Sequence, residues 1–281
     1  MGFEVALGLA RAGSDIVIAD SNEAQGRWAV EKIRRLAPSS LVRFERLDLA
    51  DLEIVKTFVR RIERIERPVD LLVNLAAVFS SARRQVTTDG FEMQLGTNYL
   101  GHFALTAQLL PLLRRGRDPR VVHVGSLSHR FASINLDDLH YERRYTPVKA
   151  YSQSKLAVLL FAFELQRRSD LGRWGVPSLA AHPGYARTSP MGSGRAKGSL
   201  LSHLHKSVGR LLSHSAAAGA LPVLYAAAAT NACPGAYYGP KGFLELGGSP
   251  GPATLSEAAR DTELAQRLWE VSERLTGVTW P

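Results

Sequence analysis

Short apolar runs alternate with longer segments of helical periodicity along most of this chain, and this alternation constrains its fold more than any other feature. The runs are apolar at successive positions rather than at every second one. Strands of that kind are typical of a parallel sheet with both faces covered, because neither face then meets water. Helices between the strands supply the crossovers that parallel pairing needs. The sequence therefore predicts an α/β fold with a doubly wound parallel sheet.

Individual elements follow from the apolar spacing and from residues that stop helices, such as Gly13 and Pro38. Helices are expected over residues 3–12, 23–36, 52–65, 91–113, 150–168, 216–229 and 255–275. Strands are expected over residues 15–19, 41–47, 69–76, 120–125, 176–182 and 237–246. A leucine-rich stripe over residues 199–213 predicts either a core helix or an apolar substrate lid. Residues 255–281 would form a C-terminal helix and tail.

The composition is that of one ordinary globular unit. The chain has 281 residues, 45% of them hydrophobic, and contains no segment that resembles an interdomain linker, so we expect a single domain over residues 1–281. Cys233 is the one cysteine and cannot form an internal disulfide. Neither a signal peptide nor a membrane-spanning stretch is recognisable. These features predict a cytoplasmic location without a membrane partner.

A formal net charge of +9 makes nucleic acid a candidate partner. Binding of that kind needs basic side chains gathered on one surface. Here they occur in short, scattered clusters such as Arg60-Arg61 and Arg114-Arg115, near the ends of expected helices, where helix dipoles and solvated faces account for them. We therefore expect no nucleic-acid partner, and no metal site.

Tyr151 and Lys155 are the strongest candidates for chemistry. Their spacing places a phenol and an ammonium on the same face of the helix expected from residue 150. A tyrosine normally titrates near pH 10, and a neighbouring cation lowers its pKa toward the working range of an enzyme. The same spacing also arises by chance in many chains, so its weight depends on position.

Ser126 occupies such a position. It follows the strand expected at residues 120–125, and ligand sites in open α/β sheets form at the carboxyl ends of the strands. Its hydroxyl either holds a substrate carbonyl or only caps a turn. His129, shortly after it, is either structural or a loop residue near the site.

Several motifs, taken in chain order, resemble the short-chain dehydrogenase/reductase family over nearly the whole sequence. Leu71-Leu-Val-Asn-Leu-Ala-Ala77 is similar to the family's strand-end Asn-Asn-Ala-Gly, and Asn98-Tyr-Leu-Gly-His-Phe103 to its helix-borne Asn motif. His182-Pro-Gly-Tyr-Ala-Arg-Thr188 is similar to its Pro-Gly loop. The segment between Ser126 and Tyr151 and the Tyr237-Tyr-Gly-Pro motif most resemble the branch that contains retinol dehydrogenases. The resemblance implies a single Rossmann-type domain.

This resemblance also implies roles. Tyr151 would be the general acid in reduction and the base in oxidation, while Lys155 would lower its pKa and hold the ribose. Ser126 would hydrogen-bond the substrate oxygen, and Asn98 would anchor a water in a proton relay. In isolation, Asn98 could equally bend a helix, and Pro183-Gly184 could be a plain turn. The resemblance further places these residues at the cofactor: Gly2, Asp20, Asp48, Leu49, Asn74, Ala76, Pro183, Gly184 and Thr188.

Asp20 bears on the choice of cofactor. A carboxylate at this strand end can accept both adenosine ribose hydroxyls, and it repels a 2'-phosphate. Ser21 follows, with no arginine adjacent. NAD(H) is therefore the expected cofactor, with NADP(H) as the alternative. An aspartate here could instead cap the following helix.

The sequence departs from the family at its start. Of the family's Thr-Gly-x-x-x-Gly-x-Gly turn only the last glycine, Gly2, is present, and the strand before that turn is missing. Either the product begins upstream of Met1, or a shortened protein has lost dinucleotide binding. We expect the first, because omitting a central strand exposes apolar edges on both of its neighbours. Leu75, Ala77 and Gly125 also replace residues that the family prefers.

The sequence thus predicts an NAD(H)-dependent oxidoreductase that interconverts a small or lipophilic alcohol and its ketone or aldehyde. The alternative is a non-catalytic dinucleotide-sensing or interaction protein derived from such an enzyme. By analogy with the family, a homodimer or homotetramer is expected, in which the helices at residues 91–113 and 150–168 pair with their symmetry mates. The substrate and the reaction direction are not readable from the sequence.

Overall fold

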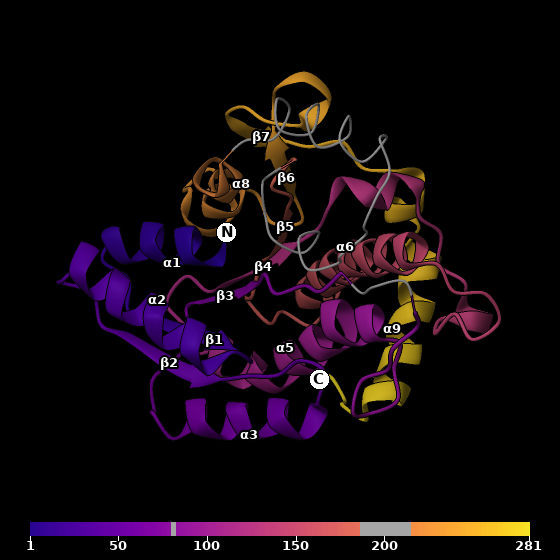
Figure 1. Cartoon of the computed structure of the whole chain (residues 1–281), viewed down its shortest axis with the longest axis horizontal. Coiled ribbons are helices and arrows are strands. Elements are labelled where there is room, and N and C mark those ends of the chain that lie inside the picture. Colours follow the sequence, from indigo (N-terminus) through magenta and orange to yellow (C-terminus); the bar gives the residue numbers. More distant parts are fainter. Residues whose placement is uncertain (80–82, 186–214) are drawn as a thin grey trace.

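The computed structural model describes residues 1–79, 83–185 and 215–281 (Figure 1). Its strands are β1 (Ile16–Asp20), β2 (Val42–Arg46), β3 (Leu71–Asn74), β4 (Arg120–Val124), β5 (Ser178–Ala181), β6 (Tyr237–Pro240) and β7 (Pro250–Pro252). Its α-helices are α1 (Gly2–Arg11), α2 (Glu23–Leu36), α3 (Leu52–Glu63), α4 (Met93–Leu95), α5 (Gly101–Leu113), α6 (Pro147–Leu171), α8 (Ala216–Ala228) and α9 (Thr262–Thr276). Shorter helical turns are η1 (Gly96–Leu100), η2 (Leu127–Phe131), η3 (Leu136–Asp138), η4 (Phe243–Glu245) and η5 (Glu257–Arg260).

The sheet consists of two parts. β1 and β2 pair in parallel, and β3, β4, β5 and β6 form a second parallel group that β7 closes with an antiparallel edge. Among the described residues no strand lies between β1 and β3, as expected from a sequence that does not contain the family's first strand. A cavity of about 2630 Å³, lined by both strands, occupies this region. We call it the central cavity.

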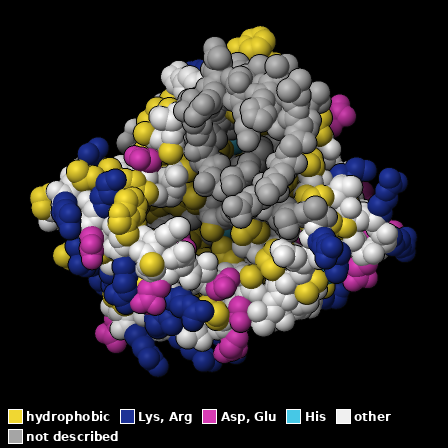
Figure 2. Space-filling model, viewed as in Figure 1, with side chains coloured by type: hydrophobic (Ala, Val, Ile, Leu, Met, Phe, Trp, Pro, Cys, Tyr) yellow, Lys and Arg dark blue, Asp and Glu magenta, His cyan; other side chains and the backbone are white. Residues whose placement is uncertain are grey.

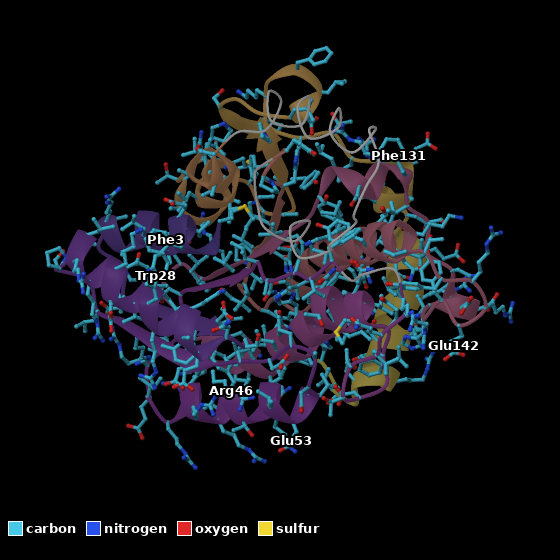
Figure 3. The ribbon with its side chains drawn as sticks, in the orientation of Figure 1. Phe3, Trp28, Arg46, Glu53, Phe131 and Glu142 are labelled. Carbon is cyan, nitrogen blue, oxygen red and sulfur yellow. The ribbon has the colours of Figure 1, made fainter. Side chains whose placement is uncertain are left out.

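Helices cover both faces of the sheet (Figure 1). On one face α1 packs against α2 and α8, and α8 lies over β4, β5 and β6. On the other face lie α3, α5 and α6, with α9 packed on the outside of α6. Phe3 and Trp28, labelled in Figure 3, mark the contact between α1 and α2, where their ring centroids are 5.4 Å apart. The α/β architecture predicted from the sequence is thus confirmed.

Local signals explain where many helices begin and end. Asn22 caps α2 by accepting a hydrogen bond from the Gln25 N–H, and Asp51 caps α3 in the same manner. α9 ends at Gly277, whose φ of 68° lies in the left-handed region that favours glycine. Helix α3 buries one apolar stripe, comprising Val55, Phe58, Val59 and Ile62. Burial of each such side chain contributes roughly 1.5 to 3 kcal/mol before conformational entropy is subtracted.

The helix predicted over residues 91–113 is not continuous. It consists of α4, the π-helical turn η1 and α5, and at the junction the Gly101 N–H bonds to the carbonyl of Gly96. Gly101 lies so close to the backbone of Leu49 that any Cβ would collide with it. This close approach depends on a distant segment, so helical periodicity could not reveal the interruption. Such π-helical turns occur frequently at functional sites.

Other boundaries also differ from the sequence prediction. The strand expected at 237–246 stops at Pro240, and the chain turns back through η4 to β7, which was not predicted. The C-terminal helix begins at Thr262, after a separate turn at η5, because Asp261 caps it there. α6 starts at Pro147, earlier than expected. The leucine-rich stripe at 199–213 and Thr188 lie outside the described residues.

Candidate active site

The four expected catalytic residues come from three elements that meet at the carboxyl ends of β3 and β4. Ser126 follows β4, Tyr151 and Lys155 lie in the first turns of α6, and Asn98 lies in η1. Ser126, Tyr151 and Lys155 line one end of the central cavity. The position predicted from the strand-end rule is therefore where these side chains gather.

Tyr151 and Ser126 hydrogen-bond to each other through their side chains. Lys155 lies beneath them, with its Nζ 5.9 Å from the centre of the Tyr151 ring. The ammonium donates a hydrogen bond to the carbonyl oxygen of Val124 at 2.8 Å, which fixes it to the end of β4. Two hydroxyl groups thus point together at the cavity, above one anchored cation.

Burial dominates the ionisation of this pair. It raises the pKa of Tyr151, an effect that the hydrogen bond with Ser126 only partly offsets. Burial also lowers the pKa of Lys155 to about 8. Burial therefore acts against the acidified phenol that the Tyr-Lys spacing predicts.

Asn98 joins neighbouring segments. Its Oδ1 accepts from the Val78 N–H at 2.7 Å, and its Nδ2 donates to the Ser154 hydroxyl at 2.9 Å and to the Val78 carbonyl at 3.1 Å. The Ser154 hydroxyl in turn donates to the carbonyl of Tyr151. The side chain therefore ties the segment after β3 to α6. Protein partners already engage both ends of the amide that was expected to anchor a water.

The residues expected at the adenosine end line the same cavity. Asp20 is the last residue of β1, Asp48 follows β2, and Leu49 lies next to Asp48. The Asp20 Oδ1 accepts a hydrogen bond from the Asn22 N–H at 2.8 Å. Because Asn22 itself caps α2, the alternative interpretation of Asp20 as the helix cap is wrong. Its carboxylate is partly exposed toward the cavity.

Gly2 and Gly184 lie at two further points on the cavity wall. Gly2 opens α1, and a helix N-terminus favours anionic groups such as a pyrophosphate. Gly184 has a φ of 69° and packs against the backbone of Glu245 and Leu246, so no other residue fits without strain. Pro183 lines the wall beside it.

Asn74 and Ala76 also border the cavity, but Asn74 is engaged elsewhere. Its Nδ2 donates to the Thr106 hydroxyl at 2.9 Å and lies 3.3 Å from the Nδ1 of His123. The side chain thus joins β3 to α5 and β4. His102 borders the cavity too, with its Nδ1 3.1 Å from the carbonyl oxygen of Asn98. Burial lowers the pKa of His102 to about 4 and that of His123 to about 3.

The cavity suits a dinucleotide cofactor at both ends. It runs from the two carboxylates after β1 and β2 to the hydroxyls of Ser126 and Tyr151, and the N-terminus of α1 lies along it. Between these ends the glycine turn that would surround the phosphates is represented by Gly2 alone. The residues present therefore fit the cofactor better at its nicotinamide and adenosine ends than at its pyrophosphate.

The sequence analysis did not single out Glu245, which packs behind the Gly184 loop. It accepts hydrogen bonds from Arg130 at 2.7 Å and from His182 at 3.0 Å. Its one local signal is a carboxylate inside the strand predicted over residues 237–246. His182 belongs to the Pro-Gly motif, and the sequence predicts His129 either as a structural residue or as a loop residue near the site.

Lys and Arg side chains are spread over the surface in Figure 2, interleaved with Asp and Glu. The face shown presents no continuous basic surface. Within one chain α5 contacts α3, and α6 contacts α9. The oligomeric state stays a prediction.

Comparisons with known proteins identify the family of this chain. Residues 1–198 match the sequence profile of the family described as short chain dehydrogenase. The chain is 40% identical to mouse polyprenol dehydrogenase over 288 residues, covering 99% of this chain and 81% of that protein. It is 38% identical to mouse retinol dehydrogenase 13, with the same coverage of both chains. A solved structure of an uncharacterized protein from Mycobacterium paratuberculosis superposes with a TM-score of 0.79 at 36% identity, over 100% of this chain and 91% of that one.

The expected cytoplasmic location is contradicted by these relatives. Retinol and polyprenol dehydrogenases are membrane-associated proteins of the endoplasmic reticulum. The sequence argument failed because a protein can associate with a membrane without a spanning segment. Separately, none of the helices in the part of the chain that the structure describes is long and apolar enough to cross a bilayer.

Motif order, site geometry and relatedness thus agree. The family generally uses NAD(P)(H), and its dehydrogenases act on the CH–OH group of their substrates. The resemblance to its retinol dehydrogenase-like branch is confirmed by the relatives above. This chain belongs to the short-chain dehydrogenase family and is an alcohol/carbonyl oxidoreductase.

Proposed function

We propose that this protein is an NAD(H)-dependent oxidoreductase that interconverts a lipophilic alcohol and its aldehyde or ketone, with Tyr151 as the acid-base residue. The observation that carries the proposal is the meeting of the Tyr151 and Ser126 hydroxyls at the cavity end, above Lys155. Two donors that converge on one point suit a substrate oxygen on which negative charge develops.

Each residue has a distinct part in the proposed reaction. In reduction, the bound cofactor supplies the hydride. The Tyr151 phenol gives its proton to the substrate oxygen, and Ser126 donates a hydrogen bond to that same oxygen. In oxidation, Tyr151 takes the proton back. Lys155 is anchored by Val124, and its remaining N–H groups are free to hold a ribose hydroxyl and to favour the ionised phenol.

The proposed cofactor preference rests on Asp20. Its carboxylate at the end of β1 lines the cavity and does not cap α2. A ribose with two free hydroxyls offers donors to this carboxylate, whereas a 2'-phosphate would be repelled. NAD(H) is therefore the proposed cofactor.

The proposed substrate class rests on the cavity wall near Tyr151. Phe79 packs edge-on against the Tyr151 ring, with centroids 5.4 Å apart, and Met93, Leu127 and Val148 also line this end. Apolar walls favour a hydrocarbon chain or ring beside the reacting oxygen. The named relatives act on retinol and polyprenol, which share this character.

Oxidation of NADH, followed by its absorbance, tests the proposal against all-trans-retinal, a polyprenal, and aromatic and aliphatic ketones. NADPH is run in parallel. We expect turnover with at least one apolar carbonyl, faster with NADH, and loss of turnover in Tyr151→Phe. Activity that Tyr151→Phe retains in full would contradict the proposal.

A non-catalytic dinucleotide-binding protein is the second candidate. The observation that favours it is that protein partners engage both ends of the Asn98 amide, which was expected to anchor a water in the proton relay. Binding of NADH without turnover of any carbonyl in the panel would support this candidate.

A further inference from the structure

A second polar cluster lies behind the active site, where the segments after β4, β5 and β6 meet. It consists of His129, Arg130, His182, Tyr237 and Glu245. None of these five residues lines the central cavity. They therefore cannot touch a ligand there, and any effect on the reaction must pass through other residues.

Glu245 is the centre of the cluster. Its Oε2 accepts from Arg130 Nη2 at 2.7 Å and from His182 Nε2 at 3.0 Å, while its Oε1 accepts from the Thr254 N–H at 2.9 Å. Its side chain is 15% exposed, so these bonds are less weakened by water than surface pairs. One carboxylate thus joins three segments that are far apart in the sequence.

The protonation of His182 follows from its partners. Its Nδ1 lies 3.1 Å from the Gly184 N–H, which can only donate, so this nitrogen must be an acceptor without a proton. The proton therefore sits on Nε2, where it is donated to Glu245. Burial lowers the pKa of His182 to about 4, which keeps the ring neutral near pH 7. A Cβ on Gly239 would collide with this ring, so its place beside β6 is closely defined.

His129 has the opposite tautomer. Its Nδ1 lies 2.6 Å from the carbonyl oxygen of Ser126, which can only accept, so Nδ1 carries the proton. Its Nε2 accepts from the Ser256 N–H at 3.3 Å. The ring of Tyr237 packs against both histidines, with centroid distances of 5.6 Å to His129 and 5.2 Å to His182. The cluster therefore reaches the backbone of Ser126 on one side and that of Gly184 on the other.

Backbone strain marks the same place. Leu244 and Glu245 have φ angles of 51° and 58°, in the left-handed region that residues other than glycine rarely adopt. Such conformations persist where the surrounding contacts hold them, and they cluster at functional sites. The Tyr185 N–H also bonds to the carbonyl of Leu246, which holds the Gly184 loop against this strained turn.

We propose that Glu245 is a positioning residue for the reaction, which fixes the Gly184 loop through His182 and the Ser126 loop through Arg130. It thereby sets the distance between the loop expected at the nicotinamide and the hydroxyl expected to bind the substrate oxygen. The inference rests on the proposed function of Ser126 and Gly184. It adds a residue outside the cavity to that function.

The main test compares Glu245→Gln with the wild type and with Glu257→Gln, which removes an exposed carboxylate in η5. Glutamine keeps the size of the side chain but replaces the carboxylate, which accepts from both Arg130 and His182, by a neutral amide. We expect kcat to fall on the order of tenfold, because small displacements of reacting groups are costly. KM for the carbonyl and Kd for NADH should change less than about threefold. Glu257→Gln should match the wild type.

A second readout needs neither cofactor nor turnover. Long-range ¹H–¹⁵N spectra of histidine-labelled protein report which ring nitrogen carries the proton. In the wild type near pH 7 we expect His182 with its proton on Nε2 and His129 with its proton on Nδ1. In Glu245→Gln we expect the His182 signals to shift, with those of His123, buried elsewhere beside β3, unchanged.

The outcomes separate the two proposals. A wild type without turnover rejects the proposed function, and the positioning role falls with it. An active wild type with unchanged kcat in Glu245→Gln rejects the positioning role alone, as does a charged or Nδ1-protonated His182 in the wild type. If Glu245→Gln does not fold, His182→Asn replaces it, since asparagine can still accept from Gly184 but cannot reach Glu245. The same fall in kcat is then expected, and full activity would overturn the inference.

Discussion

The two ends of the central cavity differ in how completely the surrounding strands and helices are buried. At the catalytic end, β5 is buried throughout and β4 over all but its first residue. Helix α5 is almost entirely buried, and α6 is buried along its central part. At the other end β1 is only half buried, with Val17 37% exposed, and the first three residues of β3 are partly exposed. Parallel strands covered on both faces should be fully buried, so the open region between β1 and β3 accounts for the difference.

This difference shows which functions depend on which packing. The elements that hold the four catalytic residues are β4, α6 and η1. The strand among them, β4, pairs with β3 and β5 and does not border the open region between β1 and β3. The positions of these four residues therefore do not depend on a strand between β1 and β3. Changes at the catalytic end should mainly alter kcat, and changes at the other end should mainly alter cofactor affinity.

The largest effect is expected from Tyr151→Phe. The phenol transfers the proton but adds little to cofactor binding, so kcat should fall by about 10² to 10⁴ while Kd for NADH stays nearly unchanged. Steady-state kinetics and NADH fluorescence titration measure the two quantities. Retention of more than a few per cent of kcat would show that Tyr151 is not the acid-base residue.

Adding a strand to the open region between β1 and β3 tests whether this end of the cavity determines cofactor affinity. A designed five-residue strand followed by a Gly-rich turn, joined before Gly2, should pair with β1 and β3 and supply backbone N–H groups to the phosphates. We expect Kd for NADH to fall on the order of tenfold or more, since charge-assisted hydrogen bonds are strong, with kcat changed less than about threefold. The same extension with two prolines in the strand is the control, because proline cannot donate to the sheet. Equal gains from both extensions would contradict this account.

Cofactor choice should depend on a single carboxylate. Asp20→Ala combined with Ser21→Arg removes the repulsion and adds a guanidinium that a 2'-phosphate prefers. The ratio of kcat/KM for NADPH over NADH should rise on the order of tenfold, which corresponds to about 1.4 kcal/mol. Asp20→Ala alone should show a smaller rise. A wild type that uses both cofactors equally would show that Asp20 does not select between them.

A further prediction concerns acid stability at the catalytic end. Burial holds the pKa of His123 at about 3, so between pH 6.5 and 4 the unfolded chain binds a proton that the folded chain does not. The stability contributed by this neutral ring is complete above the unfolded pKa and is lost as the pH falls. His123→Asn keeps a polar partner for Asn74 and removes the titration. Urea unfolding at pH 7 and pH 5 should show the wild type losing about 1 to 2 kcal/mol more than the variant. Equal losses would contradict the buried neutral state.

Sequence reasoning succeeded where the signal was local. The spacing of Tyr151 and Lys155 needs only a helix, and the position of Ser126 needs only a strand that ends before it, so the site could be placed without coordinates. The open region beside β3 could also be predicted, because the sequence contains neither the family's first strand nor its full glycine turn.

The failures share a long-range cause. The π-helical turn that contains Asn98 is followed by Gly101, which lies against the backbone of Leu49, and helical periodicity does not reveal such a contact. Burial raises the pKa of Tyr151, and an argument from spacing cannot include burial. Likewise, the partners of Glu245 come from separate segments that only the folded chain brings together.

The central claim is that the catalytic end exchanges hydride between a nicotinamide and an apolar carbonyl carbon. The most direct measurement uses NADH carrying deuterium at both C4 positions, the best carbonyl substrate of the panel, and mass spectrometry of the alcohol formed. The account predicts one deuterium on the carbinol carbon in wild-type product, and no product above background in Tyr151→Phe. Alcohol formed without deuterium, or deuterated alcohol formed equally by Tyr151→Phe, would contradict it.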